Sequence, residues 1–335
     1  MHATVKMYLA IVLIGCSLLT GTAWAEKTVF MVLWRGETRV EEGFRAYFAE
    51  TSHDLNIIVR SVDRDKSRLP AIIEEIKSVQ PDLVYTWGTS VTLGIAGQDP
   101  SLSNLKHPSQ LTDIPIVFTM VSQPVKSGVV RAFGPTGRNV SGVSHIVPVE
   151  SQLNAMQAYM PIDRIAVIFT PTESNSVLAT EQLVSHGNRQ NIRVDTFPVP
   201  LDDEGNPRPD SLPSLVYLVS QGGPQFLYLG PDSFIAENVS DITDQANQYG
   251  LPSFAATEIM LTRSDALYGL VAKYNEVGRF TASKVEQILF EGKAASEVPV
   301  EVLPEFSYQI RADVARSLKI YPNLFLMDYA EIINR

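Results

Sequence analysis

The chain alternates short apolar runs with amphipathic segments, and this alternation constrains its fold more than any other feature. Residues 28–33 are a continuous apolar run, and in residues 40–50 Phe44, Tyr47 and Phe48 recur at helical spacing. Such a pattern is typical of an α/β fold, a parallel sheet with helices on both faces. The first set of expected elements comprises strands at 28–33, 55–62, 82–86 and 114–119 and helices at 40–50, 67–79 and 90–97.

The same alternation begins again in the second half of the chain. Two similar sets in tandem predict two Rossmann-like lobes with parallel sheets rather than one large sheet. A late strand at 267–272, helix at 275–291 and strand at 306–310 can cross back to the first lobe and return. The second set comprises strands at 164–169, 192–197, 225–229 and 251–254 and helices at 174–191, 211–221 and 235–249.

The first residues have the order of a secretory signal peptide. Lys6 precedes an apolar run at 7–19, and Ala23-Trp24-Ala25 is an A-x-A cleavage signature. The run is shorter than the roughly 20 residues that a membrane span needs. We therefore expect residues 1–25 to be removed and the protein to be periplasmic. An alternative is lipidation at Cys16, which follows a small residue and would anchor the protein to the membrane.

Charge and cysteine content narrow the possible partners. The chain of 335 residues has a formal net charge of −10, and loss of Lys6 with the leader makes it −11. An acidic surface disfavours nucleic acid, whose phosphates attract basic surfaces. Cys16 is the only cysteine, so the mature chain has no intrachain disulfide and depends on burial for stability. We expect a monomer that binds no nucleic acid.

Signatures of catalysis are missing from the sequence. It contains no G-x-S-x-G, H-E-x-x-H or G-x-x-x-x-G-K-[ST] pattern, and no helix-turn-helix at its start. No two of the five histidines have the spacing of metal ligands. We expect no catalytic residue, metal or cofactor. The histidines are His2, His53, His107, His145 and His186.

Six short segments carry a family likeness. They are Tyr85-Thr-Trp-Gly-Thr-Ser90, Ile114-Pro-Ile-Val-Phe118, Val121-Ser-Gln-Pro-Val125 with Gly128, Gly137-Arg-Asn-Val-Ser-Gly-Val143, Phe169-Thr-Pro-Thr-Glu-Ser-Asn-Ser176 and Lys273-Tyr-Asn-Glu-Val-Gly278. In this order and spacing they resemble the ABC-transporter substrate-binding proteins related to tryptophan- and tyrosine-binding receptors. The likeness covers essentially the whole mature chain.

The resemblance implies a type I periplasmic-binding fold, in which three hinge strands join two lobes. The crossings are expected near residues 141–145, 271–274 and 302–307. Lobe one would then comprise residues 26–143 and 272–303, and lobe two residues 144–271 and 304–335.

Three positions depart from the family pattern. Gln123 and Lys273 stand where the family commonly has Asp, and Thr170 stands where it has Asn. A carboxylate that would meet a substrate amine is therefore absent from the turn at Gln123. The departures leave the identity of the ligand open.

Ligands of open α/β sheets bind beyond the carboxyl ends of the strands, where backbone N–H groups and helix N-termini point. The side chains expected there from both lobes would face one cleft. In lobe one they are Trp34, Arg35, Gly36, Trp87, Gly88, Thr89, Ser90, Ser122 and Gln123, and in lobe two Thr170, Glu173, Ser174, Asn175, Asp232, Thr257 and Glu258, with Tyr274 at the hinge.

Each candidate also has a structural interpretation. Trp34 and Trp87 would stack on a flat ligand or pack inside the lobe. The Gly88–Ser90 turn suits an anion, but Ser90 can equally cap its helix. Arg35 would clamp a carboxylate or remain solvated. The same choice between ligand contact and helix cap or strut applies to Ser122, Glu173, Ser174, Asn175, Asp232, Glu258 and Tyr274.

These observations predict an extracytoplasmic receptor that closes on a small ligand, by resemblance for a membrane ABC permease. Trp34, Trp87 and the Gly88–Ser90 turn favour an amino acid-like or aromatic carboxylate. One alternative is a receptor that reports to a membrane sensor kinase, which the sequence does not distinguish from a transport receptor. A less favoured alternative is an enzyme on the same scaffold.

Overall fold

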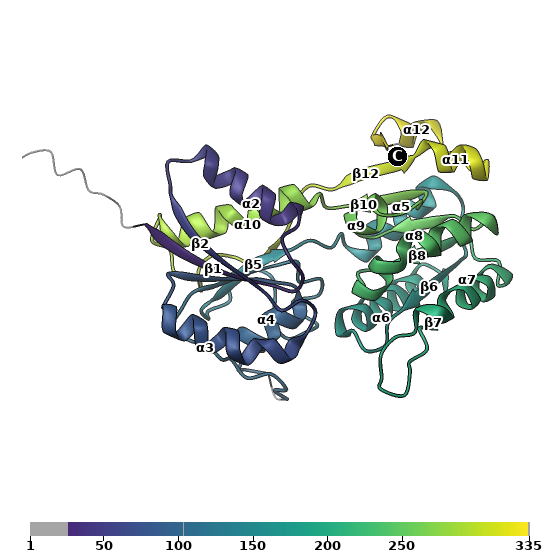
Figure 1. The fold of residues 1–335 in the computed structure, drawn as a ribbon. Coiled ribbons are helices and arrows are strands. Elements are labelled where there is room, and N and C mark those ends of the chain that lie inside the picture. The colour runs from purple at the N-terminus through teal and green to yellow at the C-terminus, as the bar shows by residue number, and fades with distance from the viewer. Residues whose placement is uncertain (1–25, 103, 334–335) are drawn as a thin grey trace, which may run out of the picture.

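The computed structural model describes residues 26–102 and 104–333, and the expected leader at 1–25 lies outside them. These residues form two α/β lobes, each built on its own sheet (Figure 1). The predicted fold class is therefore confirmed. Within the described ranges, none of the helices combines the length and apolar character that crossing a bilayer requires.

Lobe one is built on a six-stranded sheet with the strand order β11-β5-β4-β3-β1-β2, in which all paired strands are parallel. Its central strands are buried along nearly their whole length, as expected for a sheet covered on both faces. Its elements are β1 (Lys27–Leu33), β2 (Leu55–Ser61), β3 (Leu83–Trp87), β4 (Ile116–Thr119), β5 (Val140–Ser144) and β11 (Glu301–Val302), with helices α2 (Arg39–Glu50), α3 (Leu69–Val79), α4 (Thr89–Ile95) and α10 (Tyr274–Leu289) and the 3-10 turn η1 (Lys66–Arg68).

Lobe two is built on a seven-stranded sheet with the strand order β13-β12-β10-β9-β8-β6-β7. It comprises β6 (Arg164–Phe169), β7 (Arg193–Pro198), β8 (Phe226–Leu229), β9 (Ser253–Ala255), β10 (Tyr268–Val271), β12 (Ser307–Arg311) and β13 (Ala330–Ile333). Its helices are α5 (Val149–Tyr159), α6 (Ser174–Arg189), α7 (Leu212–Gln221), α8 (Ser233–Gln248), α9 (Glu258–Thr262), α11 (Ala312–Leu318) and α12 (Leu324–Met327), with the 3-10 turn η2 (Pro209–Ser211).

One pair of strands in lobe two departs from the expected parallel arrangement. Strand β12 is antiparallel to β10, while the other pairs of this sheet are parallel. A parallel neighbour requires a crossover connection within the lobe. Strand β12 is not reached from β10 by a crossover within lobe two. The chain enters β12 directly from β11 of lobe one, and β12 runs antiparallel to β10.

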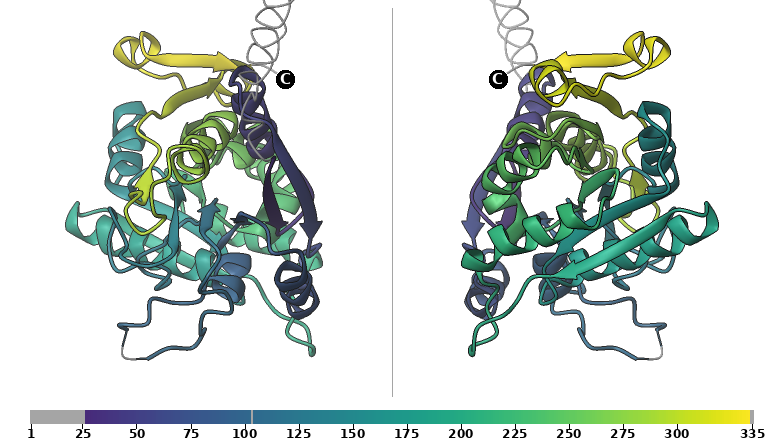
Figure 2. Two further views of the ribbon diagram at one scale, coloured as in Figure 1. Left: turned by 90° about the vertical axis from the view of Figure 1, so that its left-hand side faces the viewer. Right: turned by 90° about the vertical axis from the view of Figure 1, so that its right-hand side faces the viewer.

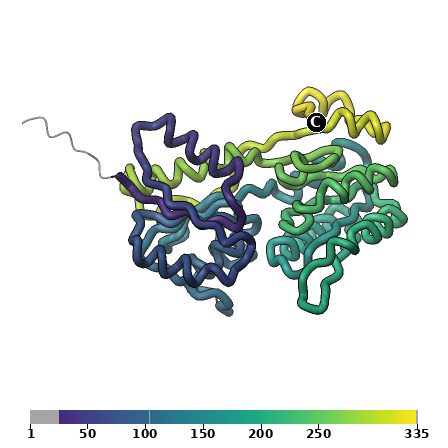
Figure 3. Tube along the Cα trace, viewed as in Figure 1, coloured from purple at the N-terminus to yellow at the C-terminus, as the bar shows by residue number. Residues whose placement is uncertain are grey.

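The chain passes between the lobes three times, from β5 to α5, from β10 to α10 and from β11 to β12 (Figure 3). Helix α10 returns to lobe one and packs closely on α2. A Cβ atom at Gly278 would lie 1.9 Å from the carbonyl oxygen of Val40, and one at Gly43 would lie 2.1 Å from that of Asn275. Glycine at both positions therefore permits the contact that joins α10 to the first lobe.

Several segments were not expected from the sequence. Helix α5 follows Pro148, has no side-chain cap and is only weakly amphipathic. Beyond β12, the chain adds α11, α12 and the edge strand β13, which lie along one edge of the molecule (Figure 2). By contrast, the polar, Pro-rich composition of residues 202–209 predicts a surface excursion. The loop after β7 is such an excursion, closed by an antiparallel bridge between Leu201 and Pro207.

Candidate ligand-binding cleft

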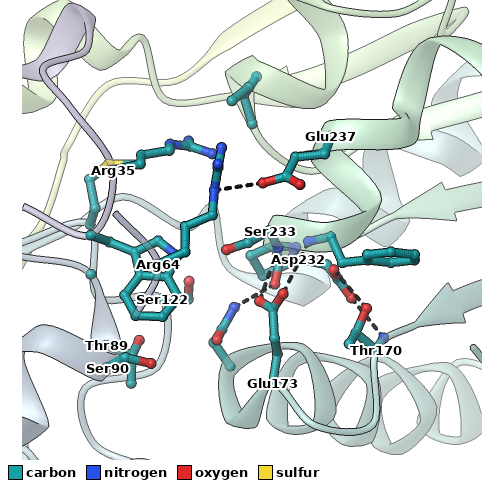
Figure 4. Close-up of a pocket in the computed structure, with 18 of the residues that line it drawn as sticks. Arg35, Arg64, Thr89, Ser90, Ser122, Thr170, Glu173, Asp232, Ser233 and Glu237 are labelled. Atoms are coloured by element: carbon teal, nitrogen blue, oxygen red, sulfur yellow. Dashed lines mark hydrogen bonds and ion pairs between the residues drawn. The ribbon is translucent and has the colours of Figure 1, made fainter. Parts of the chain in front are cut away.

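A cavity of about 500 Å³ lies between the two lobes and is lined by residues of both (Figure 4). Lobe one contributes the turns that follow β1, β2, β3 and β4, and lobe two those that follow β6, β8 and β9. The cavity therefore lies where the carboxyl ends of both sheets meet.

Thirteen of the seventeen residues proposed from the sequence line this cavity, although contact with a ligand stays a prediction for all of them. They are Trp34, Arg35, Trp87, Gly88, Thr89, Ser90, Ser122, Thr170, Glu173, Asn175, Asp232, Thr257 and Tyr274.

The other four, Gly36, Gln123, Ser174 and Glu258, are not on the cavity wall. Gly36 is exposed, and Ser174 opens α6. The carbonyl oxygen of Gln123 accepts the N–H of Ser127 at 2.9 Å, which closes the turn after β4. The Glu258 carboxylate accepts the Tyr274 N–H at 2.8 Å and so supports the β10–α10 crossing.

The lobe-one side of the cavity centres on a stacked arginine and tryptophan. The guanidinium carbon of Arg35 lies 5.0 Å from the centre of the Trp87 ring, which is a cation–π distance. Among the described residues, Arg35 makes no hydrogen bond or ion pair, and burial lowers its pKa. Trp87 is 7% exposed, and its Nε1–H has no acceptor among the described residues. A partly buried cation and a buried donor therefore lack polar partners within the part of the chain that the structure describes.

Hydroxyl groups extend this side of the cavity. The side chains of Thr89, Ser90 and Ser122 form no hydrogen bond with other described residues, and all three line the cavity. The residue that caps α4 is Gly88, with φ +86°, and no side chain bonds to the helix start. Ser90 therefore does not act as the cap, and its hydroxyl is available to a ligand.

The lobe-two side is organised around Asp232, whose two carboxylate oxygens accept two hydrogen bonds each. One oxygen accepts the Thr170 hydroxyl at 3.0 Å and the Ile235 N–H at 2.9 Å. The other accepts the Thr170 N–H at 2.7 Å and the Ser176 hydroxyl at 2.6 Å. Burial raises the pKa of Asp232. Its acceptor capacity is used within the lobe, and it caps α8.

Glu173 has acceptor capacity left over. Its two oxygens accept the N–H groups of Ser233 and Phe234, at 2.9 and 3.0 Å respectively. Burial, and then the nearby Asp232, raise its pKa. Each oxygen accepts one backbone hydrogen bond, and the Ser233 hydroxyl also interacts with the carboxylate, which leaves Glu173 at least one free lone pair. The two carboxylates also offset the positive end of the α8 dipole, so this helix start is not open to an anion.

The sequence interpretation missed several cavity residues, among them Arg64, Lys66, His145 and Glu237. Arg64 follows β2, and its Nε lies 2.6 Å from Oε1 of Glu237 in α8 (Figure 4). His145 follows β5 and is buried, and its Nδ1 has no hydrogen-bond partner within the described ranges. Burial, and secondarily Arg35, lower its pKa to about 3, so it is neutral. Arg64 and His145 could have been found from the sequence, because both follow the carboxyl end of a strand. Glu237 could not, because it lies within a helix.

Two α/β lobes with mainly parallel sheets, three crossings and an interlobe cavity define the class of type I periplasmic-binding folds. Within that class, the chain belongs to the ABC transporter substrate-binding protein family, which it matches over residues 38–332. The protein is therefore a substrate-binding protein of an ABC transporter rather than an enzyme. Members of this family typically act outside the cytoplasmic membrane.

Individual proteins resemble this chain in sequence or in fold. The chain is 26% identical, over 266 residues, to the tyrosine-binding protein of Clostridioides difficile (strain R20291), covering 79% of this chain and 71% of the relative. Its fold resembles an ABC domain from Streptococcus pneumoniae solved in complex with L-Trp, with 19% identity, TM-score 0.77 and coverage of 92% and 100% of the two chains. It also resembles a conserved domain protein from Vibrio cholerae, with 21% identity, TM-score 0.75 and coverage of 92% and 99%.

Proposed function

We propose that the cleft binds an aromatic amino acid, or a closely related aromatic carboxylate, for an ABC importer. The observation that carries the proposal is Arg35, which is partly buried, stacks on Trp87 and has no carboxylate partner among the described residues. A guanidinium binds a carboxylate through two parallel hydrogen bonds, and a desolvated charge gains most from such a partner. A ligand carboxylate at Arg35 would provide that partner.

Aromatic residues support the second half of the proposal. Trp34, Trp87 and Tyr274 line the cavity, and flat rings of this kind favour an aromatic ligand by stacking or edge contacts. A volume of about 500 Å³ suits a small molecule of amino-acid size. The names of two relatives, one tyrosine-binding and one complexed with L-Trp, point to the same chemical class.

The ammonium group of an amino acid would be met from lobe two. We assign this role to Glu173 rather than Asp232, because only Glu173 keeps a free lone pair. This replaces the carboxylate that is missing where Gln123 stands. The ligand would then bridge a basic face of lobe one and an acidic face of lobe two.

We further propose that binding closes the lobes about the three crossings. The moving bodies would be residues 26–143 with 272–303 and residues 144–271 with 304–335. A ligand shifts such an equilibrium only by its differential affinity for the closed form, so contacts with both lobes are needed. We place this cycle in the periplasm, with the closed form recognised by the membrane permease.

A thermal-shift screen of amino acids, aromatic acids, purines and sugars tests the ligand class. L-tryptophan, L-tyrosine or an aromatic acid should raise the melting temperature, because a ligand at 100 times its Kd adds about 2.7 kcal/mol to the free energy of unfolding. Stabilisation by sugars alone would overturn the proposal.

A further inference from the structure

An ion pair crosses the cleft between lobes. Arg64, in the turn after β2, faces Glu237, in the second turn of α8, with Nε and Oε1 2.6 Å apart. Both residues line the cavity, and their side chains are 46% and 38% exposed. Figure 4 shows Arg64 reaching across the gap toward Glu237. The contact therefore depends on how closely the lobes approach.

The position of Arg64 makes the contact sensitive to hinge rotation. Strands β5 and β11, which lead into two of the crossings, lie at one edge of the lobe-one sheet, and β2 lies at the other. Four strand spacings of about 4.8 Å separate β5 from β2, or about 19 Å. Groups far from a hinge travel furthest when it rotates. A small opening would therefore separate Arg64 from Glu237.

The backbone holds Arg64 in place beside the proposed ligand wall. Asp63 and Arg64 both have positive φ, +49° and +66°, which is unusual for residues other than glycine. The Arg64 N–H donates to the carbonyl oxygen of Trp34 at 2.8 Å. Because Trp34 lines the cavity, the position of Arg64 is coupled to the wall that a ligand would touch.

We propose that the Arg64–Glu237 ion pair is an interlobe latch that favours the closed cleft and slows release of the ligand. The part concerning release rests on the proposed function, whereas the effect on lobe opening does not. Exposed ion pairs contribute little individually, so the latch biases the equilibrium rather than locking it. Its contribution should weaken at high salt, because exposed charges are screened.

The chain contains a matched control. Arg60 and Glu75 form an ion pair at 2.5 Å with side-chain exposures of 45% and 36%, but both belong to lobe one. This pair has nearly the same length and solvent exposure as the latch and does not span the cleft. Removing its charge should leave lobe opening unchanged.

The first test measures lobe opening without ligand. Spin labels on Glu74→Cys in α3 and Gln221→Cys in α7, in a Cys16→Ala background, report the interlobe distance by pulsed electron paramagnetic resonance. Arg64→Gln and Glu237→Gln should each shift the population toward longer distances, and 1 M salt should shift the parent protein likewise. Arg60→Gln should not. Distances unchanged in both cleft variants would overturn the proposal.

The second test measures affinity by calorimetry with L-tryptophan. Arg64→Gln should raise Kd about two- to fivefold, mainly through faster dissociation. Arg64→Glu should raise it further, and adding Glu237→Arg should restore it to within about twofold of the parent value. A double variant no better than Arg64→Glu would contradict the latch. If the parent protein does not bind L-tryptophan, the proposed ligand is wrong, and the distance measurement still decides the latch.

Discussion

The two faces of the cleft use their polar groups differently. On lobe one, Arg35, the Trp87 Nε1–H and the hydroxyls of Ser90 and Ser122 have no hydrogen-bond partner among residues 26–102 and 104–333. On lobe two, Asp232 accepts four hydrogen bonds from its own lobe. The polar groups of the lobe-one face are thus available to a ligand, whereas many of those on the lobe-two face are already hydrogen-bonded within the lobe.

This difference predicts an order of events. Unsatisfied buried groups gain the most from a ligand, so binding should begin on lobe one. Lobe two then adds the remaining acceptor capacity of Glu173 and the latch residue Glu237 as the cleft closes. The following predictions test the contrast between the faces.

Arg35→Gln should produce the largest effect, a loss of about 30- to 100-fold in affinity for L-tryptophan by calorimetry. A charged hydrogen-bonded pair with a carboxylate is worth about 1.5–3 kcal/mol, which is the contact that the substitution removes from the complex. Stability should change little, because relief of the partly desolvated charge offsets the lost cation–π contact with Trp87.

Lys66→Gln is the matched control for Arg35. It removes one positive charge from the same cavity wall, but Lys66 does not stack on Trp87. Its Kd should change less than about threefold, as expected for an exposed charge. Equal effects of the two substitutions would show that overall charge, and not the Arg35 site, governs affinity.

Asp232→Asn should lower the free energy of unfolding by about 2 kcal/mol, measured by urea denaturation. An amide nitrogen would replace an oxygen that accepts two donors, which leaves buried hydrogen-bonding groups unpaired. Glu173→Gln is the comparison: it should destabilise less and weaken ligand binding more. If Glu173→Gln destabilised the protein more and Asp232→Asn weakened ligand binding more, Glu173 would be the structural carboxylate and Asp232 the one that binds the ligand.

His145 should give the smallest effect, a pH dependence of stability. Its pKa of about 3 in the folded protein lies below the ordinary value near 6.5. Below about pH 6.5 the unfolded state binds a proton at His145 that the folded state does not bind. The free energy of unfolding is therefore highest above about pH 6.5 and falls as the pH is lowered toward 3. Between pH 7 and 5.5 the loss is about 1 kcal/mol. His145→Gln should reduce the pH dependence of the free energy of unfolding over this range, measured by urea denaturation. An unchanged pH dependence would show that a group other than His145 titrates.

Much of the fold could be predicted because strong periodicity marks its elements. The helix expected at 211–221 is α7 at Leu212–Gln221, and the strand expected at 28–33 is β1 at Lys27–Leu33. Helix α5 escaped prediction because its sequence has little amphipathic pattern. The antiparallel direction of β12 depends on where the chain enters the sheet, which local sequence does not encode.

The site was predictable in outline because the carboxyl ends of parallel strands converge. What each side chain does there depends on distant partners. Thr170 and Asp232 are 62 residues apart, and only the fold shows that Thr170 donates two of the four hydrogen bonds that Asp232 accepts. The pair Arg64–Glu237 joins segments about 170 residues apart and also requires the lobes to approach. Local patterns carry no signal for either arrangement.

The return of α10 to lobe one has a consequence for the order in which the chain is synthesised. Strand β5 ends at Ser144, but α10 begins only about 130 residues later, at Tyr274. Val277, Val285 and Ile288 of that helix pack into the core formed by the first segment of lobe one. Until these residues are synthesised, the apolar face of lobe one that α10 covers stays exposed in the nascent chain. The elements of lobe two from α5 to β10 are, by contrast, synthesised as one uninterrupted stretch. The amino-terminal lobe is therefore completed late, and a chain that stops before α10 should aggregate.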